Sequence, residues 1–309
     1  MVCKSVNNLK SRRLFSDRTI IAMSWQRVLW HQRNLFLGAT LAPLTIPLTR
    51  WSAKRFLAQF VATRSPVVVA LQMGKVASTA LAQHVRAAAS CPMIVSAHYC
   101  ERNGTPVEHG APTGSAVLFP TLADLSLLKS ALKSRTEAGR TTRFLAGVRN
   151  PVDRLRSALL QNLESHLVRE RLRIVMLPRS IAVTANDLSA RLHTFERRFQ
   201  LEWFERELQP VSGIDVYSVP FPRTDGFATY SRGPSELFLY RYESIGNRQL
   251  IRALNSWLGC PDAPEHLPRI NETAPRMKSL RRAIQSIHLD RQVESEILSS
   301  RLYTHFYGE

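Results

Sequence analysis

Cysteine is scarce in this chain, and the few cysteines present do not form a metal-binding or redox pattern. They are Cys3, Cys91, Cys100 and Cys260, with no CxxC pair among them. Structural zinc sites and dithiol redox sites need such closely spaced pairs. The spacing therefore indicates reduced or buried thiols and no resident metal, with a Cys91–Cys100 bridge as the alternative.

Acidic residues are the second shortage. The chain has 24 Asp and Glu against 42 Lys and Arg, which gives a formal net charge of +18 at pH 7. An excess of this size favours a polyanionic partner or an anionic membrane surface. Nucleic acid, a polyphosphorylated cofactor and an acidic polysaccharide all meet this condition, so charge by itself does not choose among them.

The basic N-terminal part also lacks a long apolar run. The uncharged run between Arg33 and Arg50 is shorter than the roughly 20 residues that a membrane span needs, and it contains two prolines, which oppose a helix. We expect residues 1–64 to be a basic extension, with peripheral membrane contact as an alternative, and residues 65–309 to form the functional domain. Because no clean signal peptide precedes that domain, the expected location is the cytoplasm.

Short apolar runs alternate with helical patterns from residue 65 onward. We expect strands at 67–71, 93–97, 144–148, 215–219 and 237–240. We expect helices from about 78, over 122–138, from 151, over 186–208 and over 248–258. This alternation predicts an α/β protein with a doubly wound, mostly parallel sheet. In such folds ligands bind beyond the carboxyl ends of the strands.

The first strand leads into a loop that has the features of an anion site. The loop reads Gly74, Lys75, Val76, Ala77, Ser78, Thr79. A strand that turns through glycine into a helix presents free N–H groups and the positive end of the helix dipole. Lys75 adds a cation, and the two hydroxyl groups add donors. An ordinary turn with a solvated lysine is the alternative interpretation.

This loop departs from the loop that binds nucleoside triphosphates. The pattern GxxxxGK[ST] requires glycine at position 69 and serine or threonine at position 76. The chain has Val69 and Val76. The hydroxyl group that would hold Mg²⁺ is missing, and the sequence therefore disfavours an ordinary ATPase or kinase.

A second polar motif follows the strand at 144–148. Arg149 leaves the strand end, Asn150 is a good N-cap, and Pro151 suits the first helical position. Ser157 lies two turns into that helix, away from its apolar stripe. An arginine fork and a hydroxyl group can bracket a second phosphate. A salt-bridged surface helix is the alternative.

Together the two motifs resemble the sulfotransferase superfamily that uses 3′-phosphoadenosine 5′-phosphosulfate (PAPS). The residues that carry the likeness are Lys75, Ser78 and Thr79 in the 5′-phosphosulfate loop, and Arg149, Pro151, Arg154 and Ser157 in the R-x-P-x-x-R-x-x-S pattern of carbohydrate sulfotransferases. The resemblance covers roughly residues 65–260. It extends through residues 203–226, which are similar to bacterial capsular-polysaccharide-synthesis proteins of the sulfotransferase type, and through the RYE segment at 241–243.

The resemblance implies a P-loop NTPase-like sulfotransferase fold and transfer of a sulfuryl group from PAPS to an acceptor hydroxyl group, on a carbohydrate, without a metal. It implies that the 74–79 loop, Arg149 and Ser157 bind PAPS, and that Lys75 stabilises the leaving oxygen. An acceptor hydroxyl group needs a base, for which His98 is the first candidate and Glu101 the second. No nucleic-acid partner is expected. The alternatives are a basic polyanion- or nucleic-acid-binding protein on a degenerate P-loop fold, and a nucleotide kinase.

Overall fold

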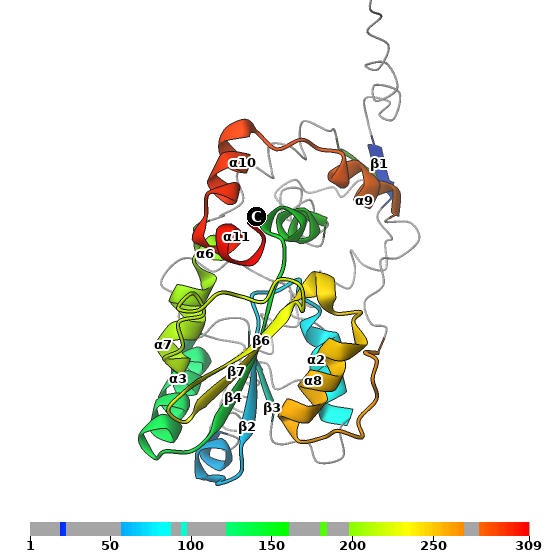
Figure 1. Cartoon of the computed structure of the whole chain (residues 1–309). Coiled ribbons are helices and arrows are strands. Elements are labelled where there is room, and N and C mark those ends of the chain that lie inside the picture. Colours follow the sequence, from blue (N-terminus) through cyan, green and yellow to red (C-terminus); the bar gives the residue numbers. More distant parts are fainter. Residues whose placement is uncertain are drawn as a thin grey trace, which may run out of the picture. The chain divides into compact units, whose positions relative to one another are not determined.

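The computed structural model describes residues 19–22, 57–87, 94–97, 122–160, 180–183, 198–268 and 278–308 (Figure 1). The chain divides into two compact units. One unit contains the described residues 57–87, 94–97, 122–154, 198–268 and 294–308, and the other contains 19–22, 155–160, 180–183 and 278–293.

The first unit is built on a five-stranded sheet. Its strands, in spatial order, are β3 (Ile94–Ala97), β2 (Val67–Leu71), β4 (Thr142–Val148), β7 (Ser235–Arg241) and β6 (Phe227–Arg232). The first four strands are parallel, and β6 pairs antiparallel with β7 at one edge. The expected α/β fold with a mostly parallel sheet is therefore confirmed, with one antiparallel strand added.

Helices flank both faces of this sheet. On one face lie α2 (Ser78–Ala87) and α8 (Arg248–Leu258), and Figure 1 shows these two helices side by side. Leu81 of α2 and Leu254 of α8 belong to the same buried cluster as Val68 of β2. Every residue of β2 is buried, as expected of a strand that is covered on both faces.

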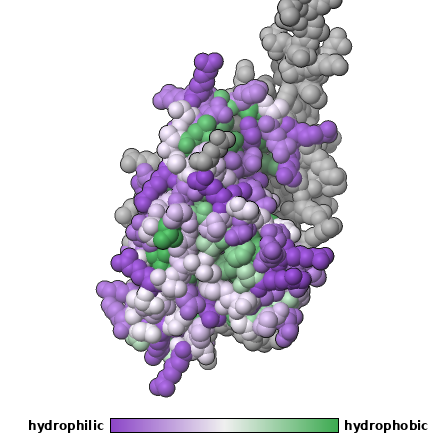
Figure 2. All heavy atoms as spheres, viewed as in Figure 1, coloured by the Kyte–Doolittle hydropathy of each residue, from purple (hydrophilic) through white to green (hydrophobic). Residues whose placement is uncertain are grey.

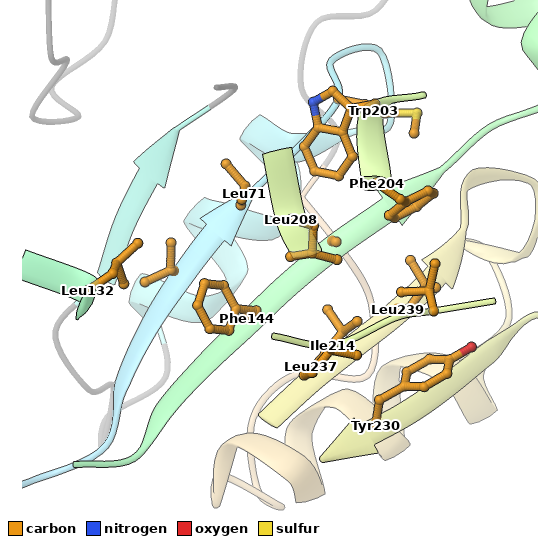
Figure 3. Packing of buried hydrophobic residues seen from close by; sticks show 14 of the residues in the cluster. Leu71, Leu132, Phe144, Trp203, Phe204, Leu208, Ile214, Tyr230, Leu237 and Leu239 are labelled. Carbon is orange, nitrogen blue, oxygen red and sulfur yellow. The ribbon is translucent and has the colours of Figure 1, made fainter. Parts of the chain in front are cut away.

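The opposite face is covered by α3 (Leu122–Glu137), by the helical segment that includes a π-helix, η1 (Phe204–Leu208), and by α11 (Arg301–Phe306). Figure 3 shows Trp203, Phe204 and Leu208 packed with Leu71, Phe144 and Leu239 of the sheet in one buried cluster. Successive side chains of β2 and β4 point to opposite faces of the sheet and thus pack into two separate hydrophobic cores.

A buried arginine joins the helical residues 57–62 to the amino edge of the sheet. Arg135 is fully buried, and its guanidinium donates to four backbone carbonyls and one hydroxyl group. The acceptors are the carbonyls of Phe60, Thr63, Ser65 and Thr141 and the hydroxyl group of Thr142. These five hydrogen bonds match the five N–H donors of a guanidinium, which is why this charge is tolerated in the core.

Most of the predicted elements are confirmed within two residues at each end. The strands at 67–71, 93–97 and 144–148 correspond to β2, β3 and β4, and the helices at 122–138 and 248–258 to α3 and α8. Gly259 ends α8 with a left-handed φ of 78°, the conformation that glycine adopts at least cost. The other predicted helices, from 78 and from 151, begin where they were expected.

The strand predicted at 215–219 is wrong. Asp215 instead starts a turn, in which its side chain accepts a hydrogen bond from the Tyr217 N–H at 3.0 Å and its carbonyl accepts one from the Ser218 N–H at 3.2 Å. An aspartate that bonds the backbone two residues on competes with strand pairing. The antiparallel neighbour of β7 is instead β6, a hairpin strand that was not predicted from the sequence.

The helix predicted at 186–208 is described only from residue 198. It consists of α6 (Arg198–Leu201), the π-helix η1 and α7 (Gln209–Ser212), so it extends four residues past its expected end. Gly213, with φ of 73°, stops it. A turn, η2 (Tyr242–Ser244), follows β7.

The second unit is smaller. β1 (Thr19–Ala22) and β5 (Ser180–Val183) form an antiparallel pair, and α9 (Lys278–Gln285) buries Ile284. α10 (Arg291–Leu298) begins in this unit at residues 291–293, and its remaining residues belong to the first unit. Among the described residues, no helix combines the length and the apolar character needed to cross a membrane. Figure 2 shows mostly hydrophilic side chains on one face, with apolar residues confined to small areas.

Candidate anion-binding site

The two predicted motifs meet where the strand order changes direction. The chain leaves β2 to form β3 on one side, and later forms β4 on the other side of β2. The segments beyond the carboxyl ends of β2 and β4 therefore flank the switch point, where α/β sheets bind ligands. Arg149 Nη1 donates to the Lys75 carbonyl at 3.1 Å, so the structure brings the two motifs together.

The loop after β2 has an unusual backbone conformation. Gly74, Lys75 and Ala77 all have positive φ, of 78°, 63° and 59°. This conformation costs a residue with a Cβ atom about 1–2 kcal/mol. Two non-glycine residues in it require support from the surrounding structure, and such strain gathers at ligand sites. Between them, Val76 is fully buried and anchors the loop in the core.

That support comes from side chains that hold the loop's carbonyl groups. Arg154, which is buried, donates to the carbonyls of Met73 and Gly74, the latter at 3.3 Å from Nε. The Tyr240 hydroxyl group lies 2.6 Å from the Val76 carbonyl. The carbonyl groups are turned toward these donors. The first N–H groups of α2, which have no acceptor within the helix, are left to bind an external anion.

Arg154 and Tyr240 have their own supports. Arg154 Nη1 donates to Gln200 Oε1 at 2.6 Å. The Tyr240 hydroxyl group also lies 3.1 Å from Gln72 Oε1, and Gln72 Nε2 lies 3.3 Å from the Leu145 carbonyl. Neither Tyr240 nor Gln72 was predicted from the sequence as a site residue. The only signal was glycine 147 inside a predicted strand, which indicates a close approach by a neighbour.

Positive charge gathers at this loop. Lys75 is half-buried, and burial together with the neighbouring Arg149 and Arg154 lowers its pKa to about 8. The partners of the two arginines named above are backbone carbonyls and an amide, which carry no net charge. Three cations that repel one another at a helix N-terminus favour the binding of an anion.

Arg149 is fixed in orientation but retains unused donor capacity. Its guanidinium carbon lies 4.2 Å from the centre of the Tyr242 ring, while Nη1 reaches the Lys75 carbonyl. Its Nε is buried and has no hydrogen-bond partner among the described residues. A guanidinium held by a ring on one face and a carbonyl at one edge is suited to bind a phosphate or sulfate.

The turn after Arg149 is capped as expected. The Asn150 side chain accepts a hydrogen bond from the Val152 N–H at 3.0 Å, and the Asn150 N–H donates to Glu243 Oε1 at 2.9 Å. Glu243 also lies 4.0 Å from Arg241 Nε and accepts a hydrogen bond from the Tyr307 hydroxyl group at 2.9 Å. The Asn150 backbone, Arg241 and Tyr307 thus meet at one carboxylate.

The remaining predicted residues have different outcomes. Ser78 and Thr79 occupy the first turn of α2, where Ser78 is half-buried and Thr79 exposed. Ser157 is half-buried in the helical residues 151–160 and belongs to the other unit. The proposed bases, His98 and Glu101, lie outside the described residues, as do three of the four cysteines. Cys260 is a buried free thiol.

Comparison with known proteins adds no relative: no family model, no curated protein and no solved structure matches this chain. The arrangement of the residues themselves therefore carries any functional conclusion. That arrangement is a strained loop at a helix N-terminus. The loop contains Lys75, and its carbonyl groups are bonded by Arg149 and Arg154. It is a site that can bind a phosphate- or sulfate-bearing ligand.

Proposed function

We propose that this protein is a sulfotransferase that moves a sulfuryl group from PAPS to an acceptor hydroxyl group, on a carbohydrate. The observation that carries the proposal is the convergence of Lys75, Arg149 and Arg154 on the loop at the N-terminus of α2. Sulfuryl transfer, like phosphoryl transfer, depends on alignment and on neutralising the charge of the leaving group. A site with several cations meets the second need.

The fold supports the same proposal. Helices on both faces of the sheet and the strand switch between β2 and β4 are features of a doubly wound sheet. We infer the P-loop NTPase-like sulfotransferase variant of that architecture, because the loop after the first sheet strand leads into the helix that carries Ser78 and Thr79.

The residues present fit a phosphosulfate better than a magnesium–nucleoside triphosphate complex. In a site for a magnesium–nucleoside triphosphate complex, position 76 would supply a hydroxyl group to Mg²⁺. Here Val76 is fully buried in the hydrophobic core and has no such group. Lys75, the first N–H groups of α2, Ser78 and Thr79 would hold the 5′-phosphosulfate. Arg149, whose Nε has no hydrogen-bond partner among the described residues, would hold the 3′-phosphate.

When bound, PAPS supplies the activated sulfuryl group and a phosphate leaving group. Lys75, whose pKa is about 8, is mostly protonated at pH 7 and can neutralise charge on the leaving oxygen. The N–H groups of the first turn of α2 would donate to the same group, and Arg154 and Tyr240 hold the loop that precedes them. His98, which lies outside the described residues, remains the proposed base for the acceptor hydroxyl group.

A calorimetric titration with adenosine 3′,5′-bisphosphate tests this proposal, with 5′-AMP, Mg-ATP and a DNA oligonucleotide as competing ligands. We expect selective binding of the bisphosphate, which is lost in Lys75→Ala and Arg149→Ala. Lys133→Ala and Arg252→Ala are the matched controls, because both residues are exposed partners in surface ion pairs. Equal binding of all ligands, or none of the bisphosphate, would refute the proposal. Tighter binding of Mg-ATP or of DNA would favour a kinase or a nucleic-acid-binding protein.

A further inference from the structure

The RYE segment at the end of β7 makes two contacts with the Arg149 turn. Tyr242 lies against the Arg149 guanidinium, and Glu243 accepts the hydrogen bond of the Asn150 N–H. Arg241 lies beside Glu243, with its guanidinium carbon 5.0 Å from the centre of the Tyr307 ring. The segment therefore contacts, through Tyr242 and Glu243, the turn whose Arg149 is proposed to bind the 3′-phosphate.

Glu243 completes the cap of the helix that follows Arg149. The N–H group of an N-cap residue has no acceptor inside its own helix, and a glutamate from the first turn often takes that bond. In this protein the acceptor is instead a carboxylate 93 positions away in the chain, at 2.9 Å from the Asn150 nitrogen. The entry angle of this helix, and with it the position of Arg149, thus depends on where Glu243 is held.

Tyr307, immediately after α11, holds Glu243. Its hydroxyl group donates to Glu243 Oε2 at 2.9 Å, so each carboxylate oxygen has one donor. Burial and the nearby carboxylate raise the pKa of Tyr307, which keeps the hydroxyl group protonated as a donor. Two contacts hold α11 in place. Phe306 is fully buried in the main core, and Arg301 Nη1 forms an ion pair with Glu205 Oε1 at 3.8 Å.

We propose that Tyr307 and Glu243 are positioning residues that hold the Arg149 turn ready for its anion, so that the residue after α11 controls ligand affinity at the end of β4. The chain of hydrogen bonds from Tyr307 through Glu243 to Asn150 is here called the latch. This inference rests on the proposed function in that the anion is the 3′-phosphate of the donor nucleotide. None of the latch residues touches the reacting atoms; they act through Arg149.

Calorimetric titration of the full chain with adenosine 3′,5′-bisphosphate tests the latch. We expect Tyr307→Phe and Glu243→Ala each to weaken binding about three- to tenfold, and the double variant to be no weaker than Glu243→Ala alone, because both act through one path. Tyr303→Phe is the matched control, because Tyr303 lies in α11 and its ring stacks on the Tyr307 ring. If Tyr307→Phe and the control both bind the bisphosphate as tightly as wild type does, the latch is refuted while the proposed function stands.

A second measurement separates failure of the latch from failure of the proposed function. Hydrogen exchange at the Asn150 amide reports its bond to Glu243 without any ligand. We expect exchange at least about fivefold faster in Tyr307→Phe and Glu243→Ala, with urea unfolding midpoints that show an intact fold. If wild-type protein does not bind the bisphosphate, the proposed function fails, and exchange at this amide still decides whether the latch exists. Unchanged exchange in both variants refutes it.

Discussion

Gly147 and Tyr240 are directly paired across the neighbouring strands β4 and β7, and the tyrosine ring lies over the glycine. A Cβ atom at position 147 would be 2.5 Å from Tyr240 Cζ and 2.6 Å from the hydroxyl oxygen. The absence of a side chain at 147 therefore lets the Tyr240 hydroxyl group reach the Val76 carbonyl at 2.6 Å. A glycine in one strand thus shapes the loop that follows another.

Replacing that glycine should disturb both stability and binding. In Gly147→Ala the added methyl group forces the Tyr240 ring away, and we expect a loss of about 1–3 kcal/mol in the free energy of unfolding. Bisphosphate binding should weaken as well. Urea unfolding and calorimetry measure the two effects. Gly246→Ala is the matched control, because a Cβ there meets nothing within 4 Å and its φ is not positive. Equal stability of the two variants would contradict this account.

The Tyr240 hydroxyl group itself should contribute to stability. Tyr240→Phe removes the donor to the Val76 carbonyl and leaves that buried acceptor unsatisfied, which should cost about 1–3 kcal/mol. Tyr230→Phe provides the control, because the Tyr230 hydroxyl group is buried without a hydrogen-bond partner among the described residues. Its removal should leave stability unchanged or slightly increased. The idea fails if the two substitutions have the same effect on the urea midpoint.

Lys75 should lower stability at neutral pH. Its pKa falls from 10.5 to about 8 in the folded state, so the charged form is disfavoured there. We expect Lys75→Met to raise the free energy of unfolding at pH 7 by about 1–3 kcal/mol while abolishing anion binding. Between pH 8 and 10.5 the unfolded wild-type chain binds more protons, so this contribution makes wild-type stability rise with pH. That rise should be absent in Lys75→Met and present in Lys133→Met.

Anion affinity should fall as pH increases through the pKa of Lys75. At pH 9 only about a tenth of the free protein carries a charged Lys75 if its pKa is about 8, and an anion that requires the charge should bind roughly tenfold more weakly than at pH 7. Lys75→Arg should remove this dependence, because arginine stays charged. Calorimetry across pH 6–9.5, in buffers of different ionisation heat, would also detect the proton taken up on binding. An affinity that does not change with pH would contradict the assignment.

The strain in the loop should be measurable at Ala77. Glycine adopts a φ of 59° without the steric cost that alanine has, although it also gains freedom in the unfolded chain. The net expectation for Ala77→Gly is an increase of about 0.5–1 kcal/mol in the free energy of unfolding. Ala87→Gly, at a helical and exposed position, should have the opposite sign. Chemical denaturation of both variants gives the comparison, and a destabilised Ala77→Gly would argue against strain at this position.

The features that could be predicted from the sequence are those specified by residues close together in the chain. The run of β-branched residues in β2, the cap at Asn150 and the glycine that ends α8 each act within a few positions, so their patterns predict them. The placement of Lys75 and Arg149 beyond two strand ends followed from the same patterns. The error at 215–219 also has a local cause, since the Asp215 turn outweighs the apolar residues around it.

The supports of the site depend on which strands become neighbours, and only the tertiary structure decides that. Tyr240 reaches Val76 because β7 lies beside β4, and Arg154 reaches Met73 because β4 lies beside β2. These partners are 164 and 81 positions apart in the chain. The sequence by itself determined most of the elements and the chemical groups at their ends, because propensity and capping act over a few residues. The fold decided which groups meet, because burial of the two faces of the sheet selects the strand order.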